Sequence, residues 1–530
     1  MATAPSSFLN TADWAVILFY MGGIIVLGSW FGKDQHNTRD YFLGGKDIPW
    51  WGIGLSIVAA ETSALTIIGV PAMAYARNGN LAFIQLIIGY VIARVILAAV
   101  MVPYYFKGEI YSPYQLFSGA FGESARNTAA GLFLLNGALS AGVRVYVACI
   151  PISLMLGRNA LGAFGGGDPV LGAIVLFVVL SLLYTYVGGV KAVIWTDAVQ
   201  FGLFLLGGVF ALCYIPHLFA GGAREACHLA AAGGKLRWFN ASVSWTSLWQ
   251  EPMNIWMGVI GGTVMVMSSH GADQLIVQRV LACKTVRDGR CALILSAVVI
   301  LPLFLIFLLV GAMLWAYYQK FPMLIPLPEV RPGSGIKAND YIFPIFIMSV
   351  VPHVLKGLLI VAILSAAMSS VSSALTSLAS VSTMDFGRKL LPGKPEAFFL
   401  RFSKISTVLW AAVLIVVAFL SRYSPRVLDT AFLLRGLTSG GLLGGLFLAL
   451  WWKRGSAKPV ILGMLSSVAV MTWLCRPHGG FLLYWPWQTM IGCAVTLLVA
   501  ILTRRLLPSA AGRLSVPSGA KPQATGENDE

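Results

Sequence analysis

The chain has 530 residues, of which 58% are hydrophobic and only 11% are charged. A soluble domain carries about 25% charged residues, so this composition excludes a water-soluble protein and indicates one that lies in a lipid bilayer. The formal net charge is +16. In a membrane protein such an excess reflects Lys and Arg in cytoplasmic loops rather than binding to nucleic acid.

Apolar windows of about 20 residues, the length that crosses a bilayer, recur from Trp14 to Leu502. We therefore predict an all-α polytopic membrane protein, because only helices and closed barrels satisfy their backbone groups in lipid. About thirteen transmembrane helices are expected, at residues 13–32, 50–75, 82–106, 127–157, 169–188, 193–217, 252–279, 291–318, 354–384, 402–421, 427–452, 459–475 and 485–503.

An odd number of helices places the two termini on opposite sides of the membrane. The connections on one side hold about twice as many Lys and Arg residues as those on the other. By the positive-inside rule, the N-terminal segment 1–12 is expected outside and the tail inside. The tail, residues 504–530, is of low complexity and is expected to be disordered. The predicted location is the plasma membrane, or the inner membrane of a bacterium.

Two predicted spans carry polar residues in their middles. The second contains Ala59-Ala60-Glu61-Thr62-Ser63-Ala64-Leu65-Thr66 followed by Gly69-Val70-Pro71, and the seventh contains Ser268-Ser269-His270-Gly271-Ala272-Asp273-Gln274. Interrupted helices in corresponding positions of two halves are typical of inverted-repeat transporters, whose binding site lies at the membrane midplane. Structural kinks are the alternative.

The ninth predicted span is rich in hydroxyl groups, with the sequence Ala366-Ala367-Met368-Ser369-Ser370-Val371-Ser372-Ser373. Residues three and four apart share a helix face, so Ala366, Ser369 and Ser370 form one patch, and Ser369, Ser372 and Ser373 form another. A hard cation such as Na⁺ requires several oxygen ligands, as Ca²⁺ does. Close packing of small residues between helices is the other interpretation.

Charged residues inside predicted spans are costly and are functional candidates, and Asp197 and Arg144 are two of them. Asp197 begins the sixth span, where it serves either as a helix-start residue or as a cation ligand. Arg144 lies in the fourth, where it either pairs with Glu61 or binds a substrate carboxylate. The cysteines and histidines show no metal-binding spacing, and no nucleophile motif or phosphate-binding loop is present. An enzyme is therefore not expected.

Several motifs resemble those of the sodium:solute symporter family. They are Tyr41-Phe42-Leu43-Gly44-Gly45-Lys46 with Trp50-Trp51, then Tyr184-Thr185 with Gly188-Gly189, Ala192-Val193 and Trp195-Thr196-Asp197 through Gln200, and then Gln274 through Gln278-Arg279. The resemblance implies a leucine-transporter-type fold of two inverted five-helix repeats. These would be residues 50–217 and 252–452, with a leading helix at 13–32 and two trailing helices at 459–503.

The resemblance also implies binding roles. The family's main sodium site would be formed by carbonyl groups of Ala59, Thr62 and Ala366 and hydroxyl groups of Ser369 and Ser370. Some members hold a second sodium ion, whose ligands would here be Asp197, Ser372 and Ser373. Substrate contacts are expected from Glu61, Thr66, Arg144, Ser269 and Gln274.

Arg144 is similar in position to the arginine that sialic-acid carriers of this family use on a carboxylate. Glu61 and Thr66 replace the amides of sugar carriers, and a sodium-linked role for Glu61 is also open. The sequence therefore predicts a symporter that imports a small polar solute with one or two sodium ions by alternating access. The solute would be carboxylate-bearing, such as a sialic acid, a monocarboxylate or an amino acid. A sodium/sugar symporter, a proton-coupled transporter and a transporter-like membrane sensor are the alternatives.

Overall fold

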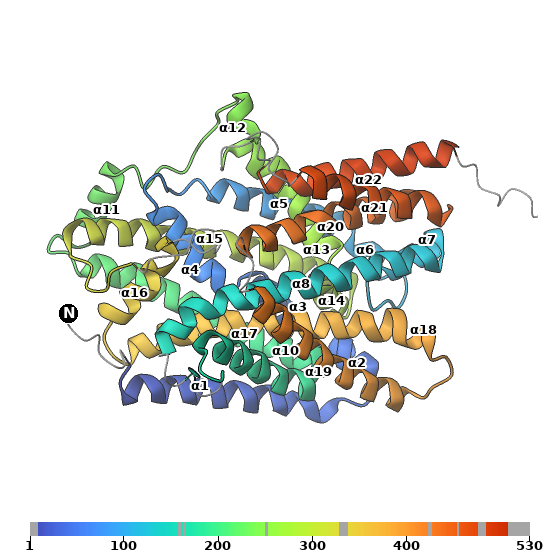
Figure 1. Ribbon diagram of the computed structural model, residues 1–530, viewed down its shortest axis with the longest axis horizontal. Coiled ribbons are helices and arrows are strands. Elements are labelled where there is room, and N and C mark those ends of the chain that lie inside the picture. Colours follow the sequence, from blue (N-terminus) through green and yellow to red (C-terminus); the bar gives the residue numbers. More distant parts are fainter. Residues whose placement is uncertain are drawn as a thin grey trace, which may run out of the picture.

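The computed structural model describes residues 9–156, 161–162, 165–249, 253–327, 338–421, 427–452, 455–474 and 484–506, and every regular element in them is a helix. The predicted all-α class is confirmed. Most helices run along the long axis of the molecule, and α1 (Thr11–Trp30) begins at the end opposite to the one where α22 (Pro486–Leu506) finishes (Figure 1). Residues 1–8 and 507–530, most of the predicted N-terminal segment and tail, lie outside the described residues.

Eight helices among the described residues are long and apolar enough to cross a membrane. They are α1, α8 (Glu123–Leu156), α10 (Pro169–His217), α15 (Val286–Lys320), α17 (Leu355–Val381) with its extension to Leu390, α19 (Glu396–Ser421), α21 (Ala457–Leu474) and α22. The bent pair α3 (Trp50–Glu61) and α4 (Ala64–Tyr75) forms a ninth. Shorter apolar helices are α5 (Ile84–Val100) and the second part of α20 (Val427–Trp451).

Short helices connect these long ones. They are η1 (Phe31–Asp34), α2 (Thr38–Leu43), η2 (Gly44–Lys46), α6 (Val102–Tyr105), α7 (Gln115–Phe121), α11 (Gly222–Ala232), α12 (Trp245–Trp249), η4 (Ala338–Tyr341), α16 (Ile342–Ser349), η5 (Ser382–Gly387) and α18 (Arg388–Leu390).

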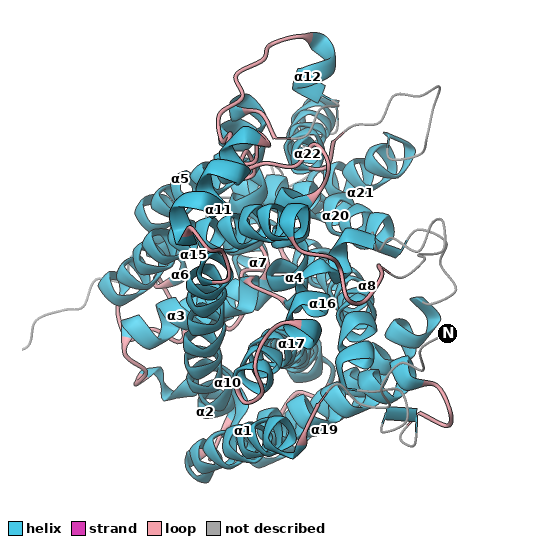
Figure 2. Ribbon diagram, turned by 90° about the vertical axis from the view of Figure 1, so that its left-hand side faces the viewer, coloured by secondary structure: helices cyan, strands magenta, loops and turns pink. Residues whose placement is uncertain are grey.

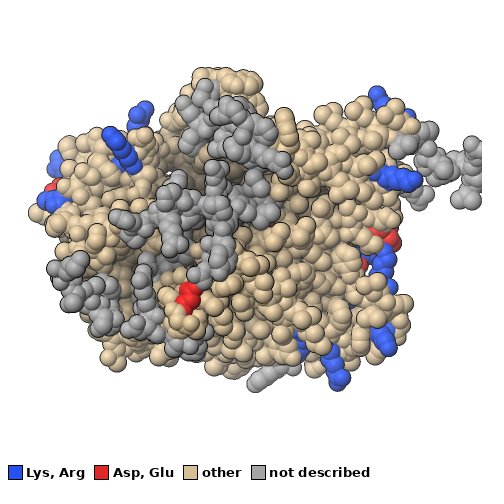
Figure 3. All heavy atoms as spheres, in the orientation of Figure 1, with Lys and Arg blue, Asp and Glu red and all other residues tan. Residues whose placement is uncertain are grey.

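On the face shown in Figure 3, the visible Lys and Arg side chains lie toward the two ends of the molecule, and the described surface between them is mostly uncharged. This distribution suits a molecule whose middle lies in hydrocarbon.

The 49-residue element α10 contains two of the predicted spans. A straight helix of that length would measure about 74 Å, more than twice the thickness of a bilayer core. Ser181 and Asp197 would lie about 24 Å apart in it, yet they bond to the neighbouring residues Met368 and Ser369 of α17. The chain must therefore reverse between them.

The reversal occurs at Gly189, which has φ 55° and ψ −151°. This backbone conformation is almost confined to glycine. A Cβ atom at this position would lie 2.5 Å from the carbonyl oxygen of Tyr41. The predicted segments 169–188 and 193–217 are thus the two arms of α10.

The two predicted interruptions are present. The break between α3 and α4 falls at Thr62 and Ser63, and the two helices meet at 61°. Pro71 lies inside α4 rather than at the break. The second interruption falls at Ala272 and Asp273, between α13 (Gly262–Gly271) and α14 (Gln274–Leu281), and α13 itself follows the π-helical turn η3 (Met257–Gly261). Each of the thirteen predicted segments thus contains helix, while the number that crosses the membrane remains a prediction.

Helix α17 lies at the centre of the bundle. In the view along the helices it is surrounded by α10, α4, α8, α1 and α19 (Figure 2), and 89% of its most apolar window is buried. Its small residues permit this close approach: the Cβ of Ala362 lies 3.1 Å from the position that a Cβ on Gly207 of α10 would take. The hydroxyl-rich stretch of α17 is therefore inside the protein and does not face lipid.

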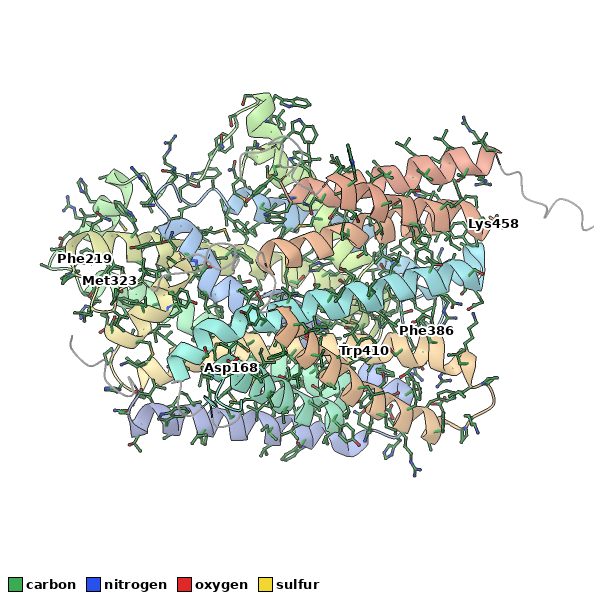
Figure 4. All side chains as sticks on the ribbon, in the orientation of Figure 1. Asp168, Phe219, Met323, Phe386, Trp410 and Lys458 are labelled. Atoms are coloured by element: carbon green, nitrogen blue, oxygen red, sulfur yellow. The ribbon has the colours of Figure 1, made fainter. Side chains whose placement is uncertain are left out.

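The segment that follows α10 forms a cap at the end of the molecule where α1 begins. Phe219 packs its ring on those of Tyr317 and Phe321, with centroids 6.3 and 5.7 Å apart. Figure 4 shows Phe219 and Met323 at this same end, and Lys458 at the opposite one. The cap, which includes α11 and Lys235, is thus anchored on the end of α15, whereas α12 further along the chain packs against α22.

A buried lysine fastens this cap to the broken helix. Lys235 is only 1% exposed, and its ammonium group lies 5.2 Å from the ring centroid of Trp315. It donates hydrogen bonds to the backbone oxygens of Tyr75, Ala76, Arg77 and Gly79. Carbonyl groups at a helix C-terminus lack helical partners and attract cations. Lys235 therefore caps the end of α4.

Candidate functional site

The break between α3 and α4 releases two carbonyl oxygens from the helical pattern. In an unbroken helix Ala59 O and Thr62 O would accept from the N–H groups of Ser63 and Thr66. Here the Ser63 N–H is donated to Thr66 Oγ1 at 3.4 Å, and the Thr66 N–H to Ser63 O at 2.8 Å. Ala59 and Thr62 are fully buried. Thr66, which was predicted to contact substrate, thus caps the first turn of α4.

The other predicted sodium ligands lie on α17, which packs against both α3 and α4. Ala366 and Ser369 are buried, and Ser370 is partly buried. The Ser370 hydroxyl donates to Ala366 O at 3.1 Å, and the Ser369 hydroxyl donates to Asp197 Oδ1 at 2.6 Å. These packed elements supply carbonyl and hydroxyl oxygens to the predicted site, which is the donor chemistry of a hard cation.

Asp197 is fully buried and forms an ion pair that the sequence did not predict. Its Oδ2 accepts from Ser56 Oγ at 2.7 Å and from Arg279 Nη2 at 2.8 Å. Arg279, also fully buried, reaches Ser373 Oγ at 2.5 Å from the same nitrogen and Ser56 Oγ at 2.8 Å from Nε. The guanidinium group thus binds two members of the predicted second sodium set, Asp197 and Ser373.

The third member of that set, Ser372, donates its hydroxyl to Ser369 O at 3.1 Å. Through Ser56, Asp197, Arg279 and Ser369, the cluster joins four helical elements, α3, α10, α14 and α17. A sodium ion at Asp197 would have to share or replace the contacts of the guanidinium group. Arg279 was noted only as part of a family motif, although its position in the short helix α14 after the break was a signal for such a role.

A cavity of about 610 Å³ lies between the two helix breaks. Three predicted substrate residues, Glu61, Arg144 and Ser269, line it together. The full lining is Ala60 and Glu61 of α3, Phe133, Asn136, Gly137, Ser140 and Arg144 of α8, Ser269 and His270 of α13, Asp273, Leu275 and Ile276 around the second break, and Ala374, Ser377 and Leu378 of α17. This cavity is called the central cavity below.

A second cavity of about 390 Å³ lies beside it. Ser63 and Arg144 line it, together with Ser370 of the predicted sodium site. Arg144 therefore belongs to the walls of both cavities, and its Nε donates to Ser140 O at 3.2 Å. One predicted sodium ligand, Ser370, thus lines the same cavity as the predicted carboxylate ligand.

Glu61, one of the two acids that line the central cavity, is paired with a cation from α5. Arg94 Nη2 binds Glu61 Oε2 directly and lies 3.1 Å from His270 Nε2. Arg94 is fully buried behind the cavity wall. The sequence analysis gave no role to Arg94, although a charge eleven residues into an apolar helix is costly in a bilayer and so is a functional signal.

Gln274, the remaining predicted substrate residue, lies outside the lining of both cavities. Its amide nitrogen donates to Tyr111 O at 2.7 Å and to Ser380 Oγ at 3.2 Å. It thus ties the start of α14 to the segment before α7 and to α17. The structure brings together Glu61, Arg144 and Ser269, and separately Ser369, Ser373 and Asp197, but places Thr66 and Gln274 elsewhere.

Two interrupted helices beside a cavity lined by charged, amide and hydroxyl side chains are typical of a secondary transporter of the inverted-repeat type. Comparisons with known proteins agree. The family model described as the sodium:solute symporter family matches residues 41–466. The sodium/sialic acid symporter SiaT of Proteus mirabilis is 30% identical over 470 residues, which cover 86% of this chain and 88% of the relative. The sodium/sialic acid symporter NanT of Aliivibrio fischeri is 29% identical, with 88% of each chain covered.

Among solved structures, the substrate-bound outward-open state of a Na⁺-coupled sialic acid symporter superposes with a TM-score of 0.79 at 26% identity, covering 94% of this chain and 98% of that one. The chain belongs to the sodium:solute symporter family. It is a multi-pass membrane transporter of leucine-transporter-type fold that couples solute import to sodium by alternating access, and it is not an enzyme. The predicted family, fold class, coupling ion and transport function are confirmed.

Proposed function

We propose that the chain imports a carboxylate-bearing polar solute of the sialic-acid type together with sodium. The observation that carries this proposal is Arg144, whose side chain lines both cavities next to Ser370 of the expected sodium site. A guanidinium group binds a carboxylate through two parallel hydrogen bonds. Asn136, Ser140 and Ser377 add amide and hydroxyl groups to the same wall, which suits a solute that also carries hydroxyl groups.

The relatives support this class of solute. Two are named as sodium/sialic acid symporters, and a bovine relative that is 24% identical is named as a sodium-coupled monocarboxylate transporter. All of these names describe solutes with one carboxylate. The polar lining of the central cavity favours the hydroxylated member of the class, and a sugar without a carboxylate would leave Arg144 without an anionic partner from the solute.

The main sodium ion is proposed to bind Ala59, Thr62, Ala366, Ser369 and Ser370. The two released carbonyl groups of α3 and the hydroxyl groups of α17 support this set. Sodium here would hold the first broken helix against α17 while the solute enters the central cavity. We place the protein in the plasma membrane, or in the inner membrane of a bacterium, with the N-terminus outside and the tail inside.

A second sodium ion is proposed at Asp197, Ser372 and Ser373, with Arg279 leaving Asp197 Oδ2 when the ion binds. The buried carboxylate and adjacent hydroxyl groups support it. With a monovalent anion as solute, two sodium ions carry one net positive charge inward, whereas one sodium ion carries none. Uptake that produces an inward current in a solid-supported membrane is the expected result. Electroneutral uptake at saturating sodium would reduce the stoichiometry to one.

The test of the solute is uptake into proteoliposomes with an inward sodium gradient. N-acetylneuraminate, lactate, proline and glucose are compared, with potassium replacing sodium in a parallel set. We expect sodium-dependent uptake of N-acetylneuraminate, inhibited by other carboxylates and not by glucose. Preferential uptake of glucose would instead identify a sugar symporter.

Arg144→Gln supplies the residue-level test. Hydrogen bonds to charged groups contribute about 1.5–3 kcal/mol, so the KM for a carboxylate solute should rise by about tenfold to hundredfold. Arg401→Gln, which changes an exposed arginine at the start of α19, is the matched control and should keep the wild-type KM. An unchanged KM in Arg144→Gln would remove Arg144 from the solute site.

A further inference from the structure

Three polar side chains in and behind the wall of the central cavity contact one another in a row. Neither the proposed sodium sites nor the proposed carboxylate contact accounts for them. Ser269 and His270 line the cavity, and Arg94 lies behind them. Ser269 Oγ lies 3.0 Å from His270 Nδ1, and Arg94 Nη2 lies 3.1 Å from His270 Nε2. The imidazole ring is therefore held at both nitrogens.

The arginine fixes the protonation state of the ring. A guanidinium group is always charged and is only a donor of hydrogen bonds, so His270 Nε2 must be the acceptor. A neutral imidazole carries its proton on one nitrogen, and here that nitrogen is Nδ1. An imidazolium would point an N–H group at the guanidinium and place two cations in contact. The other charged groups at the site are Glu61, whose Oε2 is 3.6 Å from Nε2, and Arg144 and Asp273 on the cavity wall.

The protonation state in turn orients the serine. Because Nδ1 carries the proton, it donates to Ser269 Oγ, and the serine oxygen is an acceptor in that contact. The acceptor that the described residues offer the Ser269 hydroxyl proton is Val266 O, and the distance from Ser269 Oγ to that oxygen is 3.4 Å. This is well beyond the usual O–H···O distance of about 2.7–2.8 Å. That proton is therefore available to an acceptor in the central cavity.

We propose that Arg94 is a positioning residue that keeps His270 neutral with its proton on Nδ1, so that Ser269 donates its hydroxyl proton to the solute. This inference rests on the proposed function and adds to it a second recognition contact, to a hydroxyl, carbonyl or carboxylate oxygen of the solute. Glu61 balances the charge of Arg94, so Arg94, Glu61 and the neutral His270 together add no net charge to the cavity.

Replacing Arg94 should reverse the direction of the hydrogen bond between Ser269 and His270, and this reversal should depend on pH. In Arg94→Gln, the Glu61 carboxylate is left as the charged neighbour of Nε2 and draws the ring proton to that nitrogen at pH 8. Nδ1 then accepts the Ser269 hydroxyl proton, which is lost to the solute. At pH 5.5 the ring takes up a second proton, Nδ1 donates again, and Ser269 is again a donor to the cavity.

The first measurement needs no solute. The full-length protein is labelled with ¹⁵N-histidine, and its ring nitrogens are observed by solid-state NMR, with His270 assigned by the signal absent from His270→Asn. We expect a neutral ring protonated on Nδ1 from pH 5.5 to pH 8 in the wild type. A ring protonated on Nε2, or an imidazolium within this range, would overturn the proposal whatever the solute is.

The second measurement is the KM for N-acetylneuraminate in proteoliposomes at pH 5.5 and pH 8. Loss of one neutral hydrogen bond corresponds to about a threefold to tenfold change in affinity. Arg94→Gln should show this rise in KM at pH 8 and not at pH 5.5. Arg94→Lys, which retains a charged donor, should follow the wild type. A KM in Arg94→Gln that is the same at both pH values contradicts the proposal.

A pair of histidine variants distinguishes the contact from general packing. Asparagine can place an amide N–H near the position of Nδ1, whereas glutamine places its amide near Nε2. Arg94→Gln with His270→Asn should therefore recover the wild-type KM at pH 8, and Arg94→Gln with His270→Gln should not. Equal behaviour of the two double variants would overturn the assignment. Absence of N-acetylneuraminate uptake by the wild type would refute the proposed solute, while the NMR result would still decide the role of Arg94.

Discussion

At the residue scale, the Asp197–Arg279 pair shows how this bundle combines stability with movement. Removing one partner of a buried ion pair leaves an uncompensated charge and destabilises a protein by about 3–5 kcal/mol, whereas the intact pair adds little net stability. Here the pair also links Ser56 of α3 with Ser369 and Ser373 of α17. A pair of this kind holds packed helices in register, and at the proposed second sodium site the ion would take the place of the guanidinium group.

Arg279→Met should lower the free energy of unfolding by about 3–5 kcal/mol, because Asp197 is left buried and charged. Adding Asp197→Asn should recover most of that loss, because the amide is neutral, its oxygen accepts one serine hydroxyl proton and its NH₂ group donates to the other serine oxygen. Thermal unfolding in detergent measures both. Arg290→Met, which removes a guanidinium group bound to Ala98 O, is the control for lost packing. If the double variant is no more stable than Arg279→Met, the stranded charge is not the cause.

The hydroxyl groups of α17 allow a matched comparison of sodium ligands. Ser370→Ala removes one proposed oxygen ligand and should raise the sodium concentration for half-maximal uptake by about tenfold, the equivalent of ~1.4 kcal/mol. Ser365→Ala removes a buried hydroxyl of the same helix that donates to Val361 O and should leave the sodium requirement unchanged. Equal sodium requirements in the two variants would exclude Ser370 as a ligand.

At the element scale, the cap binds the end of α4, the second half of the first broken helix. Helix α4 is short and ends at Tyr75, so its terminal carbonyl groups depend on Lys235. Because Lys235 also packs on Trp315, α4 and α15 are connected through one side chain. This connection favours movement of the two helices together during alternating access.

Lys235→Met keeps the packing on Trp315 and removes the ammonium group. The amide protons of residues 76–81 should then exchange with solvent faster, and the free energy of unfolding should fall by about 2 kcal/mol, the contribution of charge-assisted hydrogen bonds. Hydrogen–deuterium exchange with mass spectrometry measures the first effect. Arg237→Met, at an exposed position two residues away, should change neither. If the amide exchange rates are unchanged in Lys235→Met, water satisfies the carbonyl groups at the end of α4 as well as the lysine does.

The sequence predicted the elements better than their contacts. The helix breaks at Thr62 and at Asp273 could be anticipated because polar residues interrupt apolar spans there. The break at Thr62 needs no proline, and Pro71 is accommodated within α4. Pairs such as Arg94 with Glu61, 33 residues apart on different helices, depend on how the bundle packs. The spacing of residues along one helix does not indicate which residues of another helix it will contact.

At the scale of the whole molecule, charge and fold together suggest an orientation. The described chain begins and ends at opposite ends of the bundle (Figure 1), as an odd number of spans requires. The positive-inside rule then assigns the end with α11 to the outside and the end with α18 to the inside. Sodium and solute would enter beside the cap and leave beside Lys458, driven by a potential worth about 2.3 kcal/mol per charge for each 100 mV.

The orientation can be tested with a cysteine that the chain already carries. Cys227 lies on α11 and is exposed, so a membrane-impermeant maleimide should label it in intact cells, and Cys227→Ser should abolish that signal. In the Cys227→Ser background, a cysteine replacing Lys458, which is exposed at the opposite end of the molecule (Figure 4), should react only after the cells are permeabilised. Thermal stability and sodium-driven uptake of both variants confirm that the fold is kept. Labelling of Cys227 only in permeabilised cells, with Lys458→Cys labelled in intact ones, would reverse the orientation and with it the ends of the molecule at which sodium and solute enter and leave.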